Sequence, residues 1–492
     1  MFVADHHLFV RDGRHYVIDV ERMSASSIDE EAAAALERLS ADPDGGVDPE
    51  TRGRLVEMGL LMAHEPEPQA EEPAEPPPIS NITLFVTQEC NLDCVYCYGL
   101  GGQYGSPGHM SSATGMKAVD WLVGRSGDVK RLSITFFGGE PLLNFPLIQE
   151  IVEYAGEEGR RTGKEFEFGI TTNLLLLDEK KLEFIQKHKL KPMVSFDGPR
   201  EIQEKQRPFK SGRGSSYNAS IPKIKQILAV MPETPCRATI VGDADPAAVR
   251  ESLCEIGFTS VHMAPDSESL LGRTPGDRER DLAHTMQAME AEAESFLKDV
   301  EKRDFESLEK HKKTGFLCDS LGDLLNNQKR SFPCGAGRRT VAVSNSGDVF
   351  LCHRFVGTEE FKLGSVHAPD LDRGPYLRPS VDTMEGCSEC FARYLCGGGC
   401  YHDNAGRTGS AFGPAEDFCR LKRKTMELVV TIAGNLSNSD KEYLVDEGII
   451  PKKLPTQDEL DRKKRKLKAE LDALGFSEHE LKEIRASLDQ QT

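Results

Sequence analysis

Ten of the 13 cysteines in this chain of 492 residues fall into two regularly spaced groups. The first group, Cys90, Cys94 and Cys97, has the spacing C-x3-C-x2-C within QECNLDCVYCYG. The second group has seven members: Cys334, Cys352, Cys387, Cys390, Cys396, Cys400 and Cys419. Thiolates are soft ligands that suit iron–sulfur clusters and zinc. Ten such ligands fit three iron–sulfur clusters, so metal binding constrains the folds that are open to this chain.

The first group differs from an ordinary structural metal site because it supplies only three ligands. A closed cluster or a structural zinc needs four protein ligands, and no histidine lies nearby in the sequence to complete a tetrahedral site. Three cysteines on a four-iron cluster leave one iron open to a substrate or cofactor. We therefore interpret this group as a reactive site, with structural zinc as the alternative.

Composition and charge describe an ordinary globular protein, with 38% hydrophobic and 29% charged residues. Its length favours two to four domains. No apolar run approaches the roughly 20 residues of a membrane helix, and the N-terminus lacks signal-peptide features, so a cytoplasmic location with reduced thiols is expected. The net charge of −19 disfavours nucleic acid as a partner. Neither a membrane nor a nucleic acid is an expected partner.

Residues 1–64 are expected to form a small, winged-helix-like α+β module. The sequence LFVRDGRHYVIDV alternates apolar and polar residues around Asp12-Gly13, which predicts a β-hairpin. A helix should follow, with Ser27 and Glu30 as a capping box.

A second helix of this module is predicted from Asp48 to near Gly59. Residues 65–78 contain six prolines and five glutamates. This composition predicts an extended, semi-rigid linker that makes the preceding module separable.

Short apolar strands alternate with helical stretches from residue 79 to about residue 266. The predicted strands are NITLFVT, RLSITFF, FEFGITT, KPMVSFD, CRATIV and SVHMAP. Six strand–helix units favour the α/β class, with a parallel sheet forming a partial (β/α)6 TIM-like barrel. Polar motifs follow the first four strands, at Cys90, Gly138-Gly139-Glu140-Pro141, Thr172-Asn173 and Asp197-Gly198. Chemistry on such a scaffold lies at these C-terminal strand ends.

The remaining segments are predicted by composition. Residues 277–314 are charged and favour a helix that bridges two domains, which ends the barrel domain (79–315). A glycine- and cysteine-rich domain at residues 316–436 would need metal for stability. Residues 437–492 are predicted as a polar helical tail whose basic run, residues 462–468, is a solvated face or a contact for an acidic partner.

The central region resembles the radical S-adenosylmethionine (SAM) enzymes over about residues 79–266. The shared features are the three-cysteine motif, with an aromatic residue before its third cysteine, and the GGEP motif in phase with the strands. The resemblance implies that Cys90, Cys94 and Cys97 hold a [4Fe–4S] cluster whose fourth iron binds SAM. It also implies SAM contacts at Tyr96, Gly138, Gly139, Glu140, Asn173, Ser195 and Arg207. Leu174 stands where the family often has glycine.

The second cysteine group resembles the SPASM domain over about residues 316–425, and all seven cysteines agree with the family spacing. The resemblance implies two auxiliary [4Fe–4S] clusters. One would be held by Cys387, Cys390, Cys396 and Cys419, and the other by Cys334, Cys352 and Cys400. Cys318 either completes the second cluster or leaves its open iron to a substrate thiolate. Two zinc sites would also satisfy these cysteines.

Three other residues have less specific interpretations. His353 directly follows a predicted ligand, where it would pack beside a cluster or carry a proton. Cys236 and Cys254 are expected to be ordinary buried cysteines.

The first 64 residues resemble the peptide-recognition domains fused to maturases of ribosomally made peptides. An exposed strand edge there would bind a leader peptide by β-addition, and a dimerisation or packing module is the alternative. Around GGEP, and again over DGPREIQEKQRPFKSGRGSSY, the chain most resembles the thioether-forming branch of the family, which includes maturases of Cys-rich peptides and of an amine dehydrogenase subunit.

Together these resemblances imply an enzyme that cleaves SAM reductively and uses the 5′-deoxyadenosyl radical to form cysteine thioether cross-links in a precursor peptide or protein subunit. The auxiliary clusters would take the surplus electron, and flavodoxin or ferredoxin is the expected donor. Carbon–carbon bond formation, epimerisation and sulfatase maturation are alternatives, although His353 stands where sulfatase-type members carry aspartate. A non-catalytic cluster or zinc protein is the alternative outside enzymes.

Overall fold

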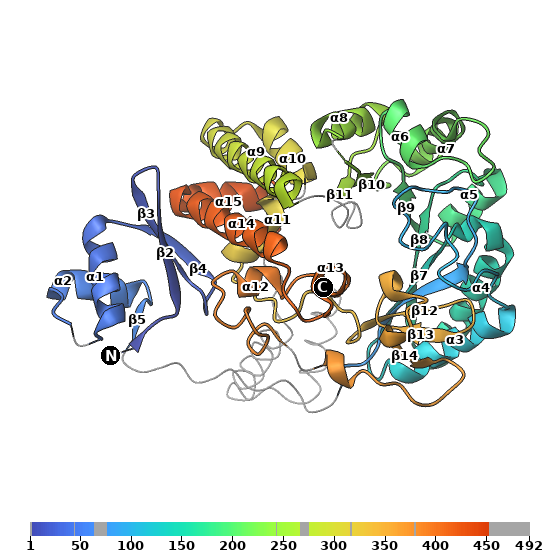
Figure 1. The fold of residues 1–492 in the computed structure, drawn as a ribbon, viewed down its shortest axis with the longest axis horizontal. Coiled ribbons are helices and arrows are strands. Elements are labelled where there is room, and N and C mark those ends of the chain that lie inside the picture. The colour runs from blue at the N-terminus through green and yellow to red at the C-terminus, as the bar shows by residue number, and fades with distance from the viewer. Residues whose placement is uncertain are drawn as a thin grey trace, which may run out of the picture.

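The computed structural model describes residues 2–43, 45–62, 76–242, 244–265, 275–314, 317–377 and 380–451. Three parts follow one another along the chain: an N-terminal module, a barrel-like α/β region and a C-terminal region that lies between the other two (Figure 1). Most of the predicted linker and nearly all of the predicted tail lie outside the described residues. None of the described helices is long and apolar enough to cross a membrane.

The N-terminal module is an α+β unit with the predicted hairpin. Its elements are β1 (Phe2–Val3), β2 (His6–Arg11), β3 (Arg14–Asp19), β4 (Ser24–Ile28), α1 (Glu30–Ala41), α2 (Pro49–Glu57) and β5 (Leu61–Met62). Strands β2, β3 and β4 form an antiparallel sheet in that order. Asp12 and Gly13 both have positive φ, 51° and 73°, as the tight turn between β2 and β3 requires.

The predicted capping box of the first helix is wrong. Ser27 belongs to β4, where it pairs with Tyr16 of β3, so its backbone is already committed to the sheet. Helix α1 instead has Asp29 as its N-cap, and the Asp29 side chain accepts a hydrogen bond from the Ala32 N–H at 2.8 Å. The second helix begins after Asp48, as predicted.

The module packs against the rest of the chain through the face of its sheet that is turned away from α1 and α2. Tyr16, Ile18 and Met23 share one apolar core with the C-terminal helices, and Figure 1 shows β3 and β4 beside α14 (Glu416–Asn435). The opposite face, including Val17, packs on α1 and α2. The predicted separable module is therefore docked in this structure.

The central sheet confirms the predicted parallel strands. They are β6 (Asn81–Thr87), β7 (Arg131–Gly138), β8 (Glu165–Thr172), β9 (Lys191–Ser195), β10 (Cys236–Ile240) and β11 (Val261–Pro265), and neighbours pair parallel in sequence order. The helices of this region are α3 (Ser112–Arg125), η1 (Pro141–Asn144), α4 (Phe145–Thr162), α5 (Glu179–Lys187), α6 (Arg200–Gln206), α7 (Ser216–Val230) and α8 (Pro246–Ile256). The α-helices lie around the outside of the curved sheet (Figure 1).

The C-terminal region extends this sheet, which the predicted boundary at residue 315 did not anticipate. Strand β12 (Thr340–Val343) pairs parallel with β6, and β13 (Asp348–Phe350) and β14 (Lys362–Ser365) follow antiparallel. The described sheet therefore has nine strands in the order β11-β10-β9-β8-β7-β6-β12-β13-β14. Two cysteine-bearing parts of the sequence are thereby joined in one sheet.

The predicted bridging segment is helical. Its helices and those that follow are α9 (Pro275–Lys302), α10 (Phe305–Thr314), α11 (Leu317–Leu325), η2 (His353–Phe355), η3 (Glu359–Phe361), η4 (Gly374–Tyr376), α12 (Arg393–Cys396), α13 (Tyr401–Thr408) and α15 (Asn438–Asp446). Helices α9, α11 and α14 pack together around buried residues such as Phe296, Leu321 and Val429.

Candidate active site

Cys90, Cys94 and Cys97 lie in the loop that leaves the C-terminal end of β6, and all three line one cavity. The Leu92 N–H donates to the Cys90 sulfur at 3.4 Å, a contact that stabilises a thiolate and tunes a bound cluster. Burial raises the pKa of Cys90 to about 12 and that of Cys94 to about 11. Since the thiolate is the metal ligand, a cation must offset this burial, and three soft donors on one wall fit an iron–sulfur cluster.

The glycines of the GGEP motif allow two loops to touch through their backbones. A Cβ on Gly138 would lie 1.8 Å from the Thr87 carbonyl oxygen, and one on Gly139 would lie 2.1 Å from the Glu89 carbonyl oxygen. The Gly139 N–H donates to Thr87 at 3.1 Å. The close approach was predicted, but the partner in this structure is the backbone that precedes Cys90, which these glycines hold in place.

Glu140 is enclosed and fully engaged by the protein. Its side chain is 1% exposed. Its carboxylate accepts hydrogen bonds from the Thr172 hydroxyl at 2.7 Å and from the N–H groups of Asn173 at 2.8 Å and Leu142 at 3.0 Å. Burial raises the pKa of Glu140, while these donors oppose the rise. In this structure Glu140 ties the ends of β7 and β8 together, and its predicted contact with SAM stays a prediction.

The turn after β8 is present although it lacks the glycine that is common in the family. Leu174 has a left-handed φ of 62° and a fully buried side chain, so apolar packing compensates for backbone strain. The Asn173 side chain donates to Asn91 at 2.9 Å. Asn173 thus links the third strand end to the cysteine loop.

Asp197, at the end of the fourth strand, connects more of the site than its predicted turn suggested. One carboxylate oxygen accepts from the Tyr96 hydroxyl at 2.7 Å and lies 2.9 Å from Arg207 Nε. The other accepts from Arg207 Nη2 at 3.1 Å and from the Thr239 N–H at 3.0 Å. Gln206 also donates to this carboxylate, at 2.8 Å. Asp197, 0% exposed, was noted in the sequence only as a turn residue, although its phase with the strands was a usable signal.

The predicted SAM contacts surround one cavity of about 1440 Å³. Tyr96, Gly138, Gly139, Glu140, Asn173, Ser195 and Arg207 all line it together with the three cysteines of the first group. Residues of α9 and of the C-terminal region, including His353 and Phe418, line the other side. The structure therefore brings the predicted contacts together and closes the barrel mouth with the domain that carries the second cysteine group.

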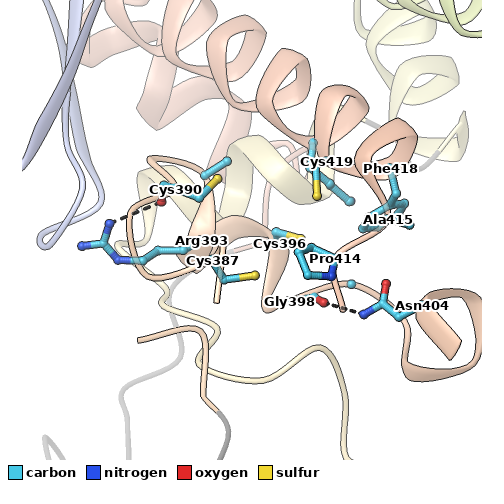
Figure 2. Close-up of a pocket in the computed structure, with 14 residues that line it drawn as sticks. Cys387, Cys390, Arg393, Cys396, Gly398, Asn404, Pro414, Ala415, Phe418 and Cys419 are labelled. Carbon is cyan, nitrogen blue, oxygen red and sulfur yellow. Dashed lines mark hydrogen bonds between the residues drawn. The ribbon is translucent and has the colours of Figure 1, made fainter. Parts of the chain in front are cut away.

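Four cysteines of the second group surround a separate small cavity. Cys387, Cys390, Cys396 and Cys419 line a space of about 20 Å³, which Figure 2 shows between them. The N–H groups of Gly398 and Gly399 point at the Cys396 sulfur and oppose the pKa rise that burial causes there. Among the described residues, no three His, Cys, Asp or Glu side chains converge as ligands of a single metal ion. Four thiols spaced around a cavity fit a multi-atom cluster.

The other predicted set, Cys334, Cys352 and Cys400, is also grouped. Burial raises the pKa of Cys352 to about 12, and negative charge on Cys400 and Cys334 adds to the rise. Arg354 lies beside this set, with its guanidinium 3.9 Å from the Cys400 sulfur. Three thiols with a cationic donor fit a cluster that lacks a fourth protein sulfur.

Cys318 is not grouped with these three cysteines. It is buried in α11, and burial raises its pKa to about 12, with Glu292 and Asp319 as its negatively charged neighbours. The structure thus favours the alternative in which Cys318 is a core residue.

The remaining cysteines and His353 are also placed. Cys236 is buried in β10, as expected, but Cys254 on α8 is exposed, which corrects its prediction. The helix pattern there turns Cys254 outward while Leu253 points inward. His353 is enclosed by aromatic rings, with Phe137 at 5.2 Å and Tyr98 at 6.4 Å between ring centres.

Residues 84–246 match the family model of the Radical SAM superfamily. These residues form a radical SAM domain. The chain is 36% identical over 140 residues to an uncharacterized protein of Methanocaldococcus jannaschii, a match that covers 28% of this chain and 46% of that protein. It is 25% identical over 299 residues to the antilisterial bacteriocin subtilosin biosynthesis protein AlbA of Bacillus subtilis, over 58% of this chain and 57% of AlbA. Both matches span less than two thirds of the relative.

A solved structure shares the fold of the radical SAM domain and the region behind it. Native anSMEcpe with bound AdoMet and the Cp18Cys peptide superposes with a TM-score of 0.57 at 18% identity, covering 73% of this chain and 100% of the other. This likeness shows that the barrel and the region that follows it are arranged as in a known SAM-binding fold. Radical SAM enzymes bind SAM and a [4Fe–4S] cluster, and the three cysteines on β6 fit that requirement.

Proposed function

We propose that this chain is a radical SAM enzyme that installs cysteine thioether cross-links in a ribosomally made precursor peptide or a protein subunit. The observation that carries the proposal is the cavity of about 1440 Å³ between the three-cysteine loop and the C-terminal region. Pockets for small molecules measure roughly 300–1,000 Å³, so this cavity has room for SAM together with a peptide segment.

The chain's own residues hold and align the reactants in this proposal. A cluster and SAM, when bound at Cys90, Cys94 and Cys97, supply a 5′-deoxyadenosyl radical. The backbone contact of Gly139 with Thr87 fixes the cysteine loop, and the buried pair of Asp197 and Arg207 fixes Tyr96 beside it. Enclosure of the cavity by α9 and the C-terminal region limits the access of water to a reactive intermediate.

Relatives named for peptide modification support a peptide substrate. Besides AlbA, the chain is 28% identical over 134 residues to the radical SAM cyclopropyl synthase TigE of Paramaledivibacter caminithermalis. The anSMEcpe structure contains a peptide. The name AlbA refers to the biosynthesis of a bacteriocin, which favours a ribosomally made peptide.

The auxiliary cysteines supply what a cross-link needs besides the radical. Joining a thiol sulfur to a carbon removes two hydrogen atoms from the peptide. One is transferred to the 5′-deoxyadenosyl carbon, and the other leaves as a proton and an electron. Cys387, Cys390, Cys396 and Cys419 would hold one electron acceptor, and Cys334, Cys352 and Cys400 another. Three [4Fe–4S] clusters in total, with flavodoxin or ferredoxin as donor, belong to this proposal.

The N-terminal module would bind the leader of the peptide. Strands β2 and β4 are the outer strands of its three-stranded sheet, and an unpaired edge accepts an extended peptide by β-addition. The module lies beside the C-terminal region (Figure 1), which keeps a bound leader close to the enzyme.

Mass spectrometry of a precursor peptide made together with the enzyme tests this function. We expect each cross-link to remove two hydrogens, with a matching loss of free thiols. Cys390→Ala should remove one auxiliary cluster, about four irons, and abolish cross-linking while SAM cleavage continues. Cys254→Ala, at an exposed cysteine outside both groups, is the control and should change neither. A modified peptide that retains every thiol would contradict thioether formation and favour carbon–carbon bonding or epimerisation.

A further inference from the structure

Arg237 lies inside the barrel and has no role in the site described above. It belongs to β10, in register with Ser195 of β9, and its side chain lines the cavity. Its neighbours along the strand, Cys236 and Ala238, are both fully buried in the core between sheet and helices. Because successive side chains of a strand point to opposite faces, the guanidinium of Arg237 is presented to the barrel interior, where it is accessible.

Other arginines of this cavity are neutralised by carboxylates, whereas Arg237 is not. Arg207 lies 2.9 Å from Asp197, and Arg354 lies 2.8 Å from Asp403. Among the described residues, no group accepts a hydrogen bond from the side chain of Arg237 and no carboxylate forms an ion pair with it. A guanidinium has five N–H donors, and an enclosed donor without an acceptor is costly.

The surroundings of Arg237 also favour an anion. Burial and the charge of Arg354 lower the pKa of Arg237, with a further contribution from Arg207. The described lining of the cavity contains six arginines and five acidic residues, although the chain as a whole carries a net charge of −19. A second cation close to an unpaired one is tolerated best when an anion lies between them.

We propose that Arg237 binds a carboxylate inside the barrel. A carboxylate accepts two parallel N–H bonds from a guanidinium, which fixes both position and orientation. Tyr96 and Tyr98 of the cysteine loop and Arg354 of the C-terminal region are its charged or ionisable neighbours, so the bound carboxylate would lie between the two cysteine groups.

Two carboxylates can occupy this position, and the inference rests on the proposed function for both. One is the methionyl carboxylate of SAM, for which Arg207 was the predicted partner. Because Asp197 already neutralises Arg207, Arg237 is the barrel cation left to meet it. The other is a carboxylate of the substrate peptide, on an acidic side chain or at its C-terminus.

The test compares Arg237→Gln with Arg237→Lys, which keeps the charge, in the cluster-loaded protein. Binding of SAM and of decarboxylated SAM is measured by calorimetry. With SAM bound, binding of N-acetyl-glutamate is then measured against N-acetyl-glutamine. The wild type should prefer the carboxylate of at least one pair, and Arg237→Gln should reduce that preference ~10–100-fold, the usual effect of losing a charge-assisted hydrogen bond. Arg237→Lys should keep part of it.

The two sources give different results. If the preference lost is that for SAM over decarboxylated SAM, Arg237 holds the methionyl carboxylate. If SAM binding is unchanged and the preference for glutamate over glutamine is lost, Arg237 holds a substrate carboxylate. A wild type that prefers neither carboxylate, or a preference that survives in Arg237→Gln, overturns the proposal.

Failure of the proposed function would be seen separately in this experiment. Formation of 5′-deoxyadenosine is assayed in the same samples after reduction. A protein that binds carboxylates through Arg237 but forms no 5′-deoxyadenosine would refute the radical SAM reaction and leave the carboxylate site intact.

Discussion

Gly139 is the residue whose side chain, or lack of one, most directly controls the position of the cysteine loop. The space for its Cβ is occupied by the Glu89 carbonyl oxygen at 2.1 Å and the Cys90 nitrogen at 2.9 Å. Both are backbone atoms, which cannot rotate away as a flexible side chain would. The loop and the β7 turn must therefore separate if any larger residue replaces this glycine.

Gly139→Ala should accordingly lower the free energy of unfolding by about 1–3 kcal/mol, as overpacking does, and weaken SAM binding. Gly124→Ala is the matched control, because a Cβ at this exposed position of α3 meets nothing within 4 Å and alanine favours a helix over glycine. Chemical denaturation measures both variants. Equal stability of the two would contradict the close contact at Gly139.

Asp197→Asn should be more damaging than its small change in shape suggests. It leaves Arg207, 7% exposed, without a charged partner, and breaking a buried ion pair costs ~3–5 kcal/mol. Glu167→Gln breaks the ion pair of Glu167 with Lys191 at 2.6 Å, whose side chains are 49% and 73% exposed, and should cost at most about 1 kcal/mol. Unfolding free energies decide between them, and a loss at Asp197 no larger than that at Glu167 would count against the buried pair.

Individual residues show where sequence reasoning was sufficient and where it was not. The cysteine spacing and the position of GGEP predicted which residues meet at the barrel mouth, because strand ends share one edge. The partners of those residues were not predictable, since Glu140 meets Thr172 and Asn173 only after two strands pair. Arg237 went unnoticed because a lone arginine in a strand has no motif around it.

At the scale of elements, local pattern predicted the parallel strands well and long-range pairing poorly. Each strand from β6 to β11 has its own apolar run, so its position could be assigned within a residue or two. The pairing of β12 with β6 joins residues about 260 positions apart in the sequence, and no local signal records it. The same limit applies to the docking of the N-terminal module on α14.

Glu21 is the charged centre of that docking. Its carboxylate accepts from Arg393 at 2.7 Å, from Lys329 at 2.7 Å and from the Tyr394 hydroxyl at 3.0 Å. Arg393 lies in α12, between the predicted ligands Cys390 and Cys396, and also donates to Asp5 at 2.6 Å. One carboxylate thus joins the N-terminal module to the loop that carries auxiliary cysteines.

Glu21→Gln should loosen the module without unfolding the barrel. Burial alone would raise the pKa of Glu21, but hydrogen bonds from Lys329 and Arg393 outweigh it and hold the pKa below its usual value. The stabilisation is therefore complete above the unfolded pKa of about 4.3 and is lost as the pH falls through the lower pKa of the folded protein.

Hydrogen exchange of β2 to β4 measures this effect. At pH 7 Glu21→Gln should exchange faster than the wild type in these strands. Arg14→Ala, which removes an exposed hydrogen bond to Asn435 on the same interface, should have little effect. The wild type should approach the behaviour of Glu21→Gln only in acid, and unchanged exchange in the variant at pH 7 would contradict the role of Glu21.

At the scale of the whole molecule, the barrel is completed by a part of the chain far away in sequence. Helix α9 and the C-terminal region close the cavity that the three cysteines of the first group open into. Two cysteine groups about 240 residues apart thereby come to lie around or next to one enclosed space. This arrangement suits a reaction that starts at one metal group and delivers an electron to another.

The most direct test of this account is the anaerobic formation of 5′-deoxyadenosine from SAM by the iron-reconstituted, reduced chain. We expect the wild type to form it and Cys94→Ala to form none, with Cys254→Ala as active as the wild type. Iron analysis of the same samples should show Cys94→Ala short of about one four-iron cluster. Wild-type protein that contains zinc in place of iron, or that leaves SAM intact, would contradict the central claim.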